Sequence, residues 1–184
     1  MSFTFTPEVQ ARPDTSKPGI FLGGSIEMGK AEDWQAEMIK EFDVNTINVF
    51  NPRRANWDST WEQSIHNRNF EKQVTWELDM IQASDCVIMM FKPDTQSPIS
   101  LLEFGLIAGA NGEGALNKMI VSCPKGFWRK GNVDVVAKRF HIPVIDDPKE
   151  FVDEARAMMM RNWERRTTIK NQGWDYRQGG GLPG

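Results

Sequence analysis

The chain has 184 residues, of which 40% are hydrophobic, and its formal net charge at pH 7 is -3. This length is enough for one domain with a full core, and the slightly acidic charge gives no electrostatic footprint for nucleic acid or an anionic membrane surface. No apolar run reaches the length of a membrane span, and residues 1–17 lack the basic start and apolar core of a signal peptide. We therefore expect a cytoplasmic protein with a small-molecule partner.

Short apolar runs alternate with amphipathic segments along the chain. In chain order, the predicted elements are strand 19–23, helix 33–42, strand 46–50, helix 67–83, strand 85–91, helix 98–110, strand 118–123, helix 133–140, strand 142–145 and helix 149–168. This alternation predicts an α/β fold, a doubly wound, Rossmann- or flavodoxin-like three-layer sandwich with a five-stranded, mainly parallel sheet. Residues 1–170 are expected to form a single domain, and the Gly-rich residues 171–184 a flexible tail.

The loop after the first strand begins with two glycines and a serine, Gly23, Gly24 and Ser25. Glycine lets backbone amides approach a ligand closely, so these residues are candidates for substrate binding, although a simple strand-to-helix turn explains them as well. Residues 24–30 also have the spacing of a phosphate-binding P-loop. However, Ala31 stands where that motif needs Ser or Thr, and Glu27 would bring a negative charge among phosphates. We therefore place a P-loop kinase last among the candidate functions and expect no metal or cofactor.

The loop after the second strand is rich in aromatic and polar side chains, including Asn51, Arg53 and Trp57. Tryptophans beside amides suit the stacking of a planar heterocycle and the reading of its edge. These three residues are therefore candidates for substrate binding. A tryptophan that covers one end of the core, or one that lies at a subunit contact, explains Trp57 equally well.

Two carboxylates, Glu77 and Asp79, lie on the helix before the third strand. Residues two apart project about 200° apart on a helix, so we expect only one of them to be functional. The charge pattern alone favours a solvated face for either one. Asp94, in the loop after the third strand, is a further candidate acid.

Glu103 is the one carboxylate in an otherwise apolar helix that directly follows the third strand. Ser97 is the predicted N-cap and Pro98 the first helical residue, which puts Glu103 within the first two turns. The helix dipole should favour the ionised form there, so that the carboxylate is available as a nucleophile. A glutamate that forms a salt bridge or a cap near the sheet edge is the alternative.

Five segments of the chain, taken in order, resemble the nucleoside 2-deoxyribosyltransferases, most closely their transferase-like branch, and are similar to the 2'-deoxynucleoside 5'-phosphate N-hydrolases. These segments are residues 20–26 (Ile-Phe-Leu-Gly-Gly-Ser-Ile), 51–54 (Asn-Pro-Arg-Arg), 76–79 (Trp-Glu-Leu-Asp), 102–105 (Leu-Glu-Phe-Gly) and 130–134 (Lys-Gly-Asn-Val-Asp). The resemblance covers roughly residues 19–145. It implies that Glu103 is the nucleophile and that Glu77, eight positions before Asp85, contacts the reacting nucleoside. It also implies a homo-oligomer with shared active sites, in which Asn132 completes a neighbour's pocket.

The chemistry of that family suits these residue types. Cleavage of an N-glycosidic bond builds positive charge on the sugar, which Glu103 can trap as a covalent glycosyl-enzyme. The departing base needs a proton or a hydrogen bond, for which Glu77 is the first candidate and Asp94 the second. Release by a second nucleobase gives transfer, and release by water gives hydrolysis of a deoxynucleoside, a deoxynucleotide or another N-glycoside such as NAD.

Three positions depart from the family pattern. Phe21 replaces a tyrosine whose hydroxyl orients the nucleophile, although it remains a candidate pocket residue. Glu27 replaces the arginine of the phosphate-preferring hydrolases, which favours a nucleoside over a nucleotide. Ser97 replaces an aspartate, for which Asp94 is the candidate substitute. The departures at Phe21 and Ser97 keep open a third function, a non-catalytic nucleoside-binding domain.

Two further features lie outside the site. Cys86 and Cys123 fall in predicted strands, which suits a reducing compartment better than a disulfide scaffold. Residues 151–168 are more apolar than a solvated helix needs. Docking on the sheet explains this, with a subunit interface as the alternative.

Overall fold

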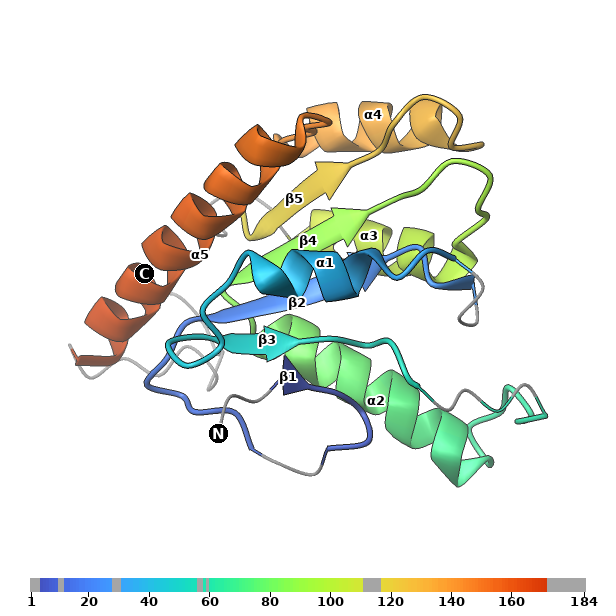
Figure 1. Ribbon diagram of the computed structural model, residues 1–184, viewed down its shortest axis with the longest axis horizontal. Helices are drawn as coiled ribbons and strands as arrows, with labels where there is room; N and C mark the ends of the chain where they lie inside the picture. The colour runs from blue at the N-terminus through green and yellow to red at the C-terminus, as the bar shows by residue number, and fades with distance from the viewer. Residues whose placement is uncertain are drawn as a thin grey trace, which may run out of the picture.

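The computed structural model describes residues 4–9, 12–27, 31–55, 58, 60–110 and 117–171, and only the backbone of residues 170 and 171. In these residues, five parallel strands form one sheet with the order β1-β3-β2-β4-β5. The strands are β1 Thr4–Phe5, β2 Gly19–Gly24, β3 Asn48–Phe50, β4 Cys86–Met90 and β5 Met119–Ser122. The helices are α1 Trp34–Lys40, α2 Arg68–Ala83, α3 Pro98–Ala110, α4 Lys130–Arg139 and α5 Pro148–Asn171. This is the doubly wound, three-layer α/β fold that the sequence predicts, with α1 and α3 on opposite faces of the sheet (Figure 1).

The fifth strand is not the one that the sequence analysis predicts. Residues 142–145 make only an isolated bridge, in which Val144 pairs with Val121. Pro143 has no N–H to donate, and Pro148 begins the next helix soon afterwards, so the ladder stops there. The place at the other edge is taken by Thr4–Phe5, which pairs in parallel with β3. Two residues are too few to leave a periodic signal in the sequence.

The side chains of β2 alternate between two cores. Phe21 packs on the face that carries α2, α3 and α4, whereas Ile20 and Leu22 pack on the face that carries α1 and α5. The period of two residues in a strand produces this alternation, and helices on both faces make the strand apolar throughout. Phe21 lies against Trp76 of α2, with ring centroids 6.5 Å apart. Its position is therefore on the same face as Glu77 and Glu103.

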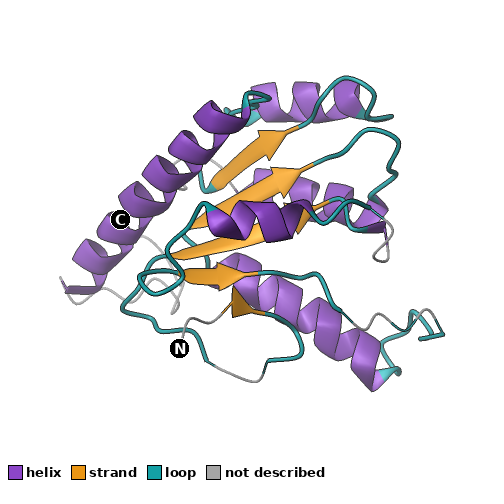
Figure 2. Cartoon of the chain, in the orientation of Figure 1, coloured by secondary structure: helices purple, strands orange, loops and turns teal. Residues whose placement is uncertain are grey.

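Because the strands are parallel, the loops that follow them all lie at one edge of the sheet. Figure 2 shows the arrowheads pointing the same way, with the connecting loops gathered beyond them. In doubly wound folds this carboxyl edge is where ligands bind. The loops after β2, β3 and β4 meet there, and they carry the predicted site residues Ser25, Asn51, Arg53 and Asp94.

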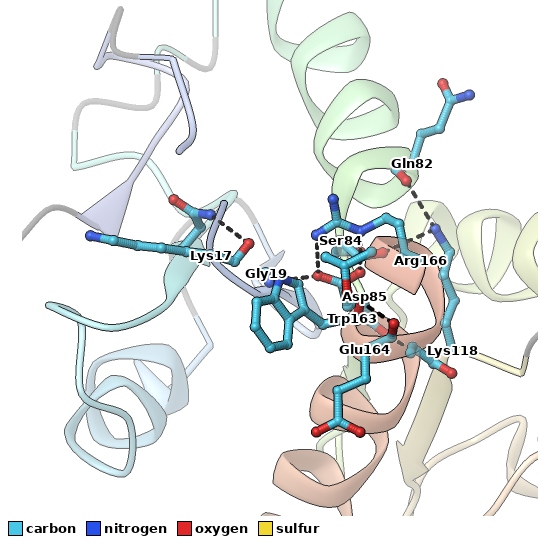
Figure 3. A network of polar contacts seen from close by, with 12 residues as sticks. Lys17, Gly19, Gln82, Ser84, Asp85, Lys118, Trp163, Glu164 and Arg166 are labelled. Carbon is cyan, nitrogen blue, oxygen red and sulfur yellow. Dashed lines mark hydrogen bonds and ion pairs between the residues drawn. The ribbon is translucent and has the colours of Figure 1, made fainter. Parts of the chain in front are cut away.

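A polar network at the opposite, amino edge ties the last helix to the sheet (Figure 3). Asp85, which is 4% exposed, accepts a hydrogen bond from the Gly19 N–H and two from the guanidinium of Arg166 in α5. Lys118 donates to the carbonyls of Ile81 and Ser84 at the end of α2. Docking of the predicted helix 149–168 on the sheet is therefore confirmed. The flexible tail stays a prediction, since residues 172–184 lie outside the described residues, and so does the domain boundary at residue 170.

Candidate active site

Two carboxylates meet on the α2 and α3 face of the sheet. Glu103 points inward from α3 and is 9% exposed, and Glu77 is half-buried on α2. They lie close enough for the charge of Glu77 to raise the pKa of Glu103. Asp79, two residues further along α2, is exposed. Only one of the two α2 carboxylates was expected to turn inward, and it is Glu77.

Burial controls the protonation of this pair. It raises the pKa of Glu103 from 4.5 to about 8, and Glu77 adds to the rise. It raises the pKa of Glu77 to about 7, against the opposing effects of a hydrogen bond from Gln73 and the charge of Arg54. The prediction that the helix dipole keeps Glu103 ionised is therefore wrong. Glu103 lies in the second turn of α3, beyond the strongest part of the dipole, and receives no hydrogen bond from a described residue.

Gln73 and Arg54 support Glu77, and neither was among the residues selected from the sequence. The Gln73 Nε2 donates to Glu77 Oε1 at 2.7 Å, and its Oε1 accepts from Arg54 Nη1 at 2.9 Å. Arg54 also lies over the Trp61 ring, 5.0 Å from its centroid. The spacing of four residues between Gln73 and Glu77 on a predicted helix was an available signal for this contact.

Arg53, the arginine chosen from the sequence, turns toward α1 instead. Its guanidinium donates to the carbonyls of Ala31 and Glu32 and to the Gln35 side chain. Asn51 accepts from the backbone N–H of Arg53 at 3.0 Å, so its side chain shapes this loop. The loop after β3 thus sends its two adjacent arginines to opposite sides.

The end of β2 and the loop that follows it are in contact with other parts of the chain. A Cβ at Gly24 would lie 2.1 Å from the Met90 oxygen, so glycine is needed there for β2 to approach β4. A Cβ at Gly23 would meet Met89 and Phe21 at 3.2 Å, again within the core. Ser25 is fully buried, and its hydroxyl lies 2.7 Å from those of Thr95 and Ser97. These hydroxyls join the loops after β2 and β4.

The Glu27 carboxylate binds the backbone amides at the N-terminus of α3. Its Oε1 accepts from the backbone N–H groups of Gln96 and Ser97, at 2.8 and 2.6 Å. Ser97 is in the N-cap position, because its carbonyl accepts from the Leu101 N–H, but its side chain turns to Ser25 rather than to the helix. The amides that a bound anion would use are therefore held by a carboxylate of the protein.

The remaining predicted residues are exposed or lie outside the described residues. Asp94 is exposed in the loop after β4, with a positive φ of 58°. Asn132 is exposed on α4. Trp57 lies outside the described residues.

The outer face of α3 carries no polar side chain among its exposed residues. These are Pro98, Ile99, Leu102, Gly105, Leu106, Gly109 and Ala110. Ile99, Leu102 and Leu106 are each more than half exposed. A helix that is apolar on all sides is normally covered, so this face is unusual for one in contact with water.

A cleft of about 730 Å³ lies on the other face, between α1 and α5. Trp34 and Met38 of α1 and Phe151 and Val152 of α5 line its apolar part. It is separated from the carboxylate pair by the sheet. Within the part of the chain that the structure describes, no three His, Cys, Asp or Glu side chains gather as a metal site would need, and no helix is long and apolar enough to cross a membrane.

The fold and the carboxylate pair define a class of protein: a doubly wound α/β domain with two carboxyl groups of raised pKa on one face of the sheet. The particular family follows from a comparison with family models. The model described as "Nucleoside 2-deoxyribosyltransferase like" matches residues 17–127, more than half of the chain, and the protein belongs to this family. The match includes Glu77 and Glu103 and ends before Asn132. A comparison with curated proteins found no match.

Proposed function

We propose that the protein cleaves the N-glycosidic bond of a 2'-deoxynucleoside and transfers the deoxyribosyl group to another nucleobase. The observation that carries this proposal is the buried pair of Glu103 and Glu77 on the face that the family match covers. Two acids with pKa values near neutrality can hold one proton between them, which is what a nucleophile and an acid need.

The reaction balances with these two groups. The ionised Glu103 forms a bond with the anomeric carbon as the bond from that carbon to the base nitrogen breaks. Glu77 gives its proton to the departing base, with Asp94 as the second candidate. An incoming base then attacks the anomeric carbon, releases Glu103 and returns a proton to Glu77. Positive charge on the sugar favours the ionised form of Glu103 as the bond breaks.

Glu27 supports a nucleoside rather than a nucleotide as the substrate. Its carboxylate already accepts from the amides of Gln96 and Ser97, so a 5'-phosphate would compete with it and be repelled. The other residues proposed to contact the substrate are Phe21, Gly23, Gly24, Ser25, Asn51, Arg53, Trp57, Asp79 and Asn132.

Hydrolysis is the second candidate function. The partial exposure of Glu77 favours it, since water that reaches this acid can also reach the glycosyl-enzyme. In that case the enzyme releases free base and sugar from a deoxynucleoside, a deoxynucleotide or another N-glycoside.

We also propose that the protein acts as a homo-oligomer in which a second copy covers the outer face of α3. A two-fold axis across this helix would let Leu102 and Leu106 of one copy pack over Gly105 and Gly109 of the other, where an added Cβ meets nothing within 4 Å. The same patch then serves both copies. Asn132, exposed on the neighbouring helix α4, is the residue proposed to reach the partner's site.

One experiment tests the enzyme proposal. The protein is incubated with a deoxynucleoside, with and without a second free base, and the products are separated by chromatography. Base exchange supports transfer, and free base without exchange supports hydrolysis. Glu103→Gln should abolish both, whereas Glu71→Gln, an exposed glutamate on α2, should not. Binding without turnover of any deoxynucleoside or deoxynucleotide would leave the non-catalytic binding domain as the function.

A further inference from the structure

The amide of Gln73 is held in one orientation by two partners of fixed polarity. Gln73 is 3% exposed. Its Oε1 accepts from Arg54 Nη1 at 2.9 Å, and its Nε2 donates to the Pro52 carbonyl at 3.1 Å. A guanidinium can only donate hydrogen bonds, and a carbonyl can only accept them. The amide therefore cannot be reversed without losing both contacts.

This orientation dictates what Glu77 can do. One N–H of the Gln73 amide is used by Pro52, and the other points at Glu77 Oε1, 2.7 Å away. Oε1 accepts this bond, and the carbonyl oxygen of a protonated carboxyl accepts better than its hydroxyl oxygen, so the bond favours a proton on Oε2. No described residue makes a hydrogen bond with Oε2.

We propose that Gln73 is a positioning residue that confines the acidic proton of Glu77 to Oε2, with Arg54 as the group that locks Gln73. The catalytic role of this arrangement rests on the proposed function, in which Glu77 Oε2 gives its proton to the departing base. It also explains the role of Arg54, whose side chain is 16% exposed and packs over Trp61. Arg54 acts on Glu77 in two ways: its charge lowers the pKa of Glu77, and its hydrogen bond holds the Gln73 amide that donates to Glu77.

The groups that set the pKa of Glu77 act in opposite directions. Burial raises it, and the bond from Gln73 and the charge of Arg54 lower it. Glu103 on α3 is the acid on the facing helix, and Glu8 lies 3.6 Å from Arg54 Nε, measured from its Oε1. Removal of the Gln73 donor leaves burial with less opposition, so the pKa of Glu77 should rise.

The test is a carbon NMR titration of the full chain with carboxyl-labelled glutamate, with Glu77→Gln used to assign the resonance. Gln73→Met should raise the titration midpoint of Glu77 by about one pH unit or more, since a hydrogen bond to a charged group is lost. Gln73→Leu, which also removes the donor and adds no charge, is the second variant in case the methionine variant fails to fold, and it should move the midpoint the same way. Gln82→Met, an exposed glutamine on the same helix, should leave it unchanged.

An unchanged Glu77 midpoint in both folded Gln73 variants would overturn the proposal. In the enzyme assay, the pH dependence of kcat should move with the midpoint, while KM changes little, which a purely structural role would not produce. The titration needs no substrate. If it shifts as expected but the wild-type protein converts no deoxynucleoside, the positioning of Glu77 stands and the proposed reaction fails.

Discussion

Replacement of Glu103 by glutamine should stabilise the protein, by an amount that grows with pH. Burial raises the pKa of this carboxyl from 4.5 to about 8 in the folded protein. Between these values the folded state keeps a proton that the unfolded state releases, so stability falls as pH rises, by about 1.4 kcal/mol per pH unit. The penalty is absent below about pH 4.5 and complete above about pH 8, where it reaches about 5 kcal/mol as an upper bound. Glutamine has no proton to lose and escapes it.

Urea unfolding of the wild-type protein and Glu103→Gln between about pH 5 and pH 9 measures this difference. The gain should be small at the acidic end and several kcal/mol at the alkaline end. Glu71→Gln, whose side chain is exposed on α2, should give no gain that depends on pH. A gain for Glu103→Gln that is the same at every pH, or a loss of stability at alkaline pH, would refute the assignment of burial as the cause.

The remaining predictions concern the reaction, its substrate, the assembly and the amino edge. The pH profile of kcat/KM should be bell-shaped with its maximum between about pH 7 and pH 8, because Glu103 must lose a proton and Glu77 must keep one. Glu27→Gln should raise the kcat/KM for a 5'-nucleotide relative to its nucleoside about fivefold, since about 1 kcal/mol of repulsion is removed, as measured in a competition assay. Leu102→Glu should shift the protein to a smaller species in sedimentation. Arg166→Met should lower the free energy of unfolding in urea by about 3–5 kcal/mol, because it leaves a buried carboxylate unpaired.

Each of these predictions has an outcome that contradicts it. A kcat/KM that rises steadily to alkaline pH would remove the need for an acid of pKa near 7. Equal effects of Glu27→Gln on nucleoside and nucleotide would separate Glu27 from phosphate selection. Ile65→Glu, at another exposed apolar residue, should leave the assembly unchanged, and an equal effect would argue against α3 as the interface. Arg165→Met, at an exposed position on α5, should cost little, and a similar loss from it would point to the helix rather than the ion pair.

The sequence was most informative where several local signals agree. Pro98 and the apolar run after it predicted α3 with the bounds that the structure has, because a helix start and a buried face coincide there. Helical geometry also predicted that only one of Glu77 and Asp79 turns inward, and the family resemblance selected Glu77. The helix bounds and the exclusion of one carboxylate rest on short-range periodicity, which one sequence contains.

The parts that the sequence could not supply depend on tertiary packing. Adjacent arginines look alike in a loop, and only the fold sends Arg53 to α1 and Arg54 to Gln73. The helix dipole predicted an ionised Glu103, but burial raises the pKa of Glu103 by more than the dipole lowers it. How deeply a side chain is buried depends on the packing of the whole fold. Thr4–Phe5 forms an edge strand because β3 provides backbone hydrogen-bonding groups for it, and not because of its own composition.

The ion pair between Asp85 and Arg166 has a consequence for synthesis of the chain. The two residues are 81 positions apart, so β4 leaves the ribosome long before the helix that neutralises its buried aspartate. Until α5 arrives, the sheet would have to enclose an unpaired charge, which disfavours a finished core. We therefore expect the nascent chain to stay open until nearly all of it has been made, and a fragment that ends before Arg166 not to fold. The domain thus completes its folding only after α5 has been made, as expected for a parallel sheet that depends on long-range contacts.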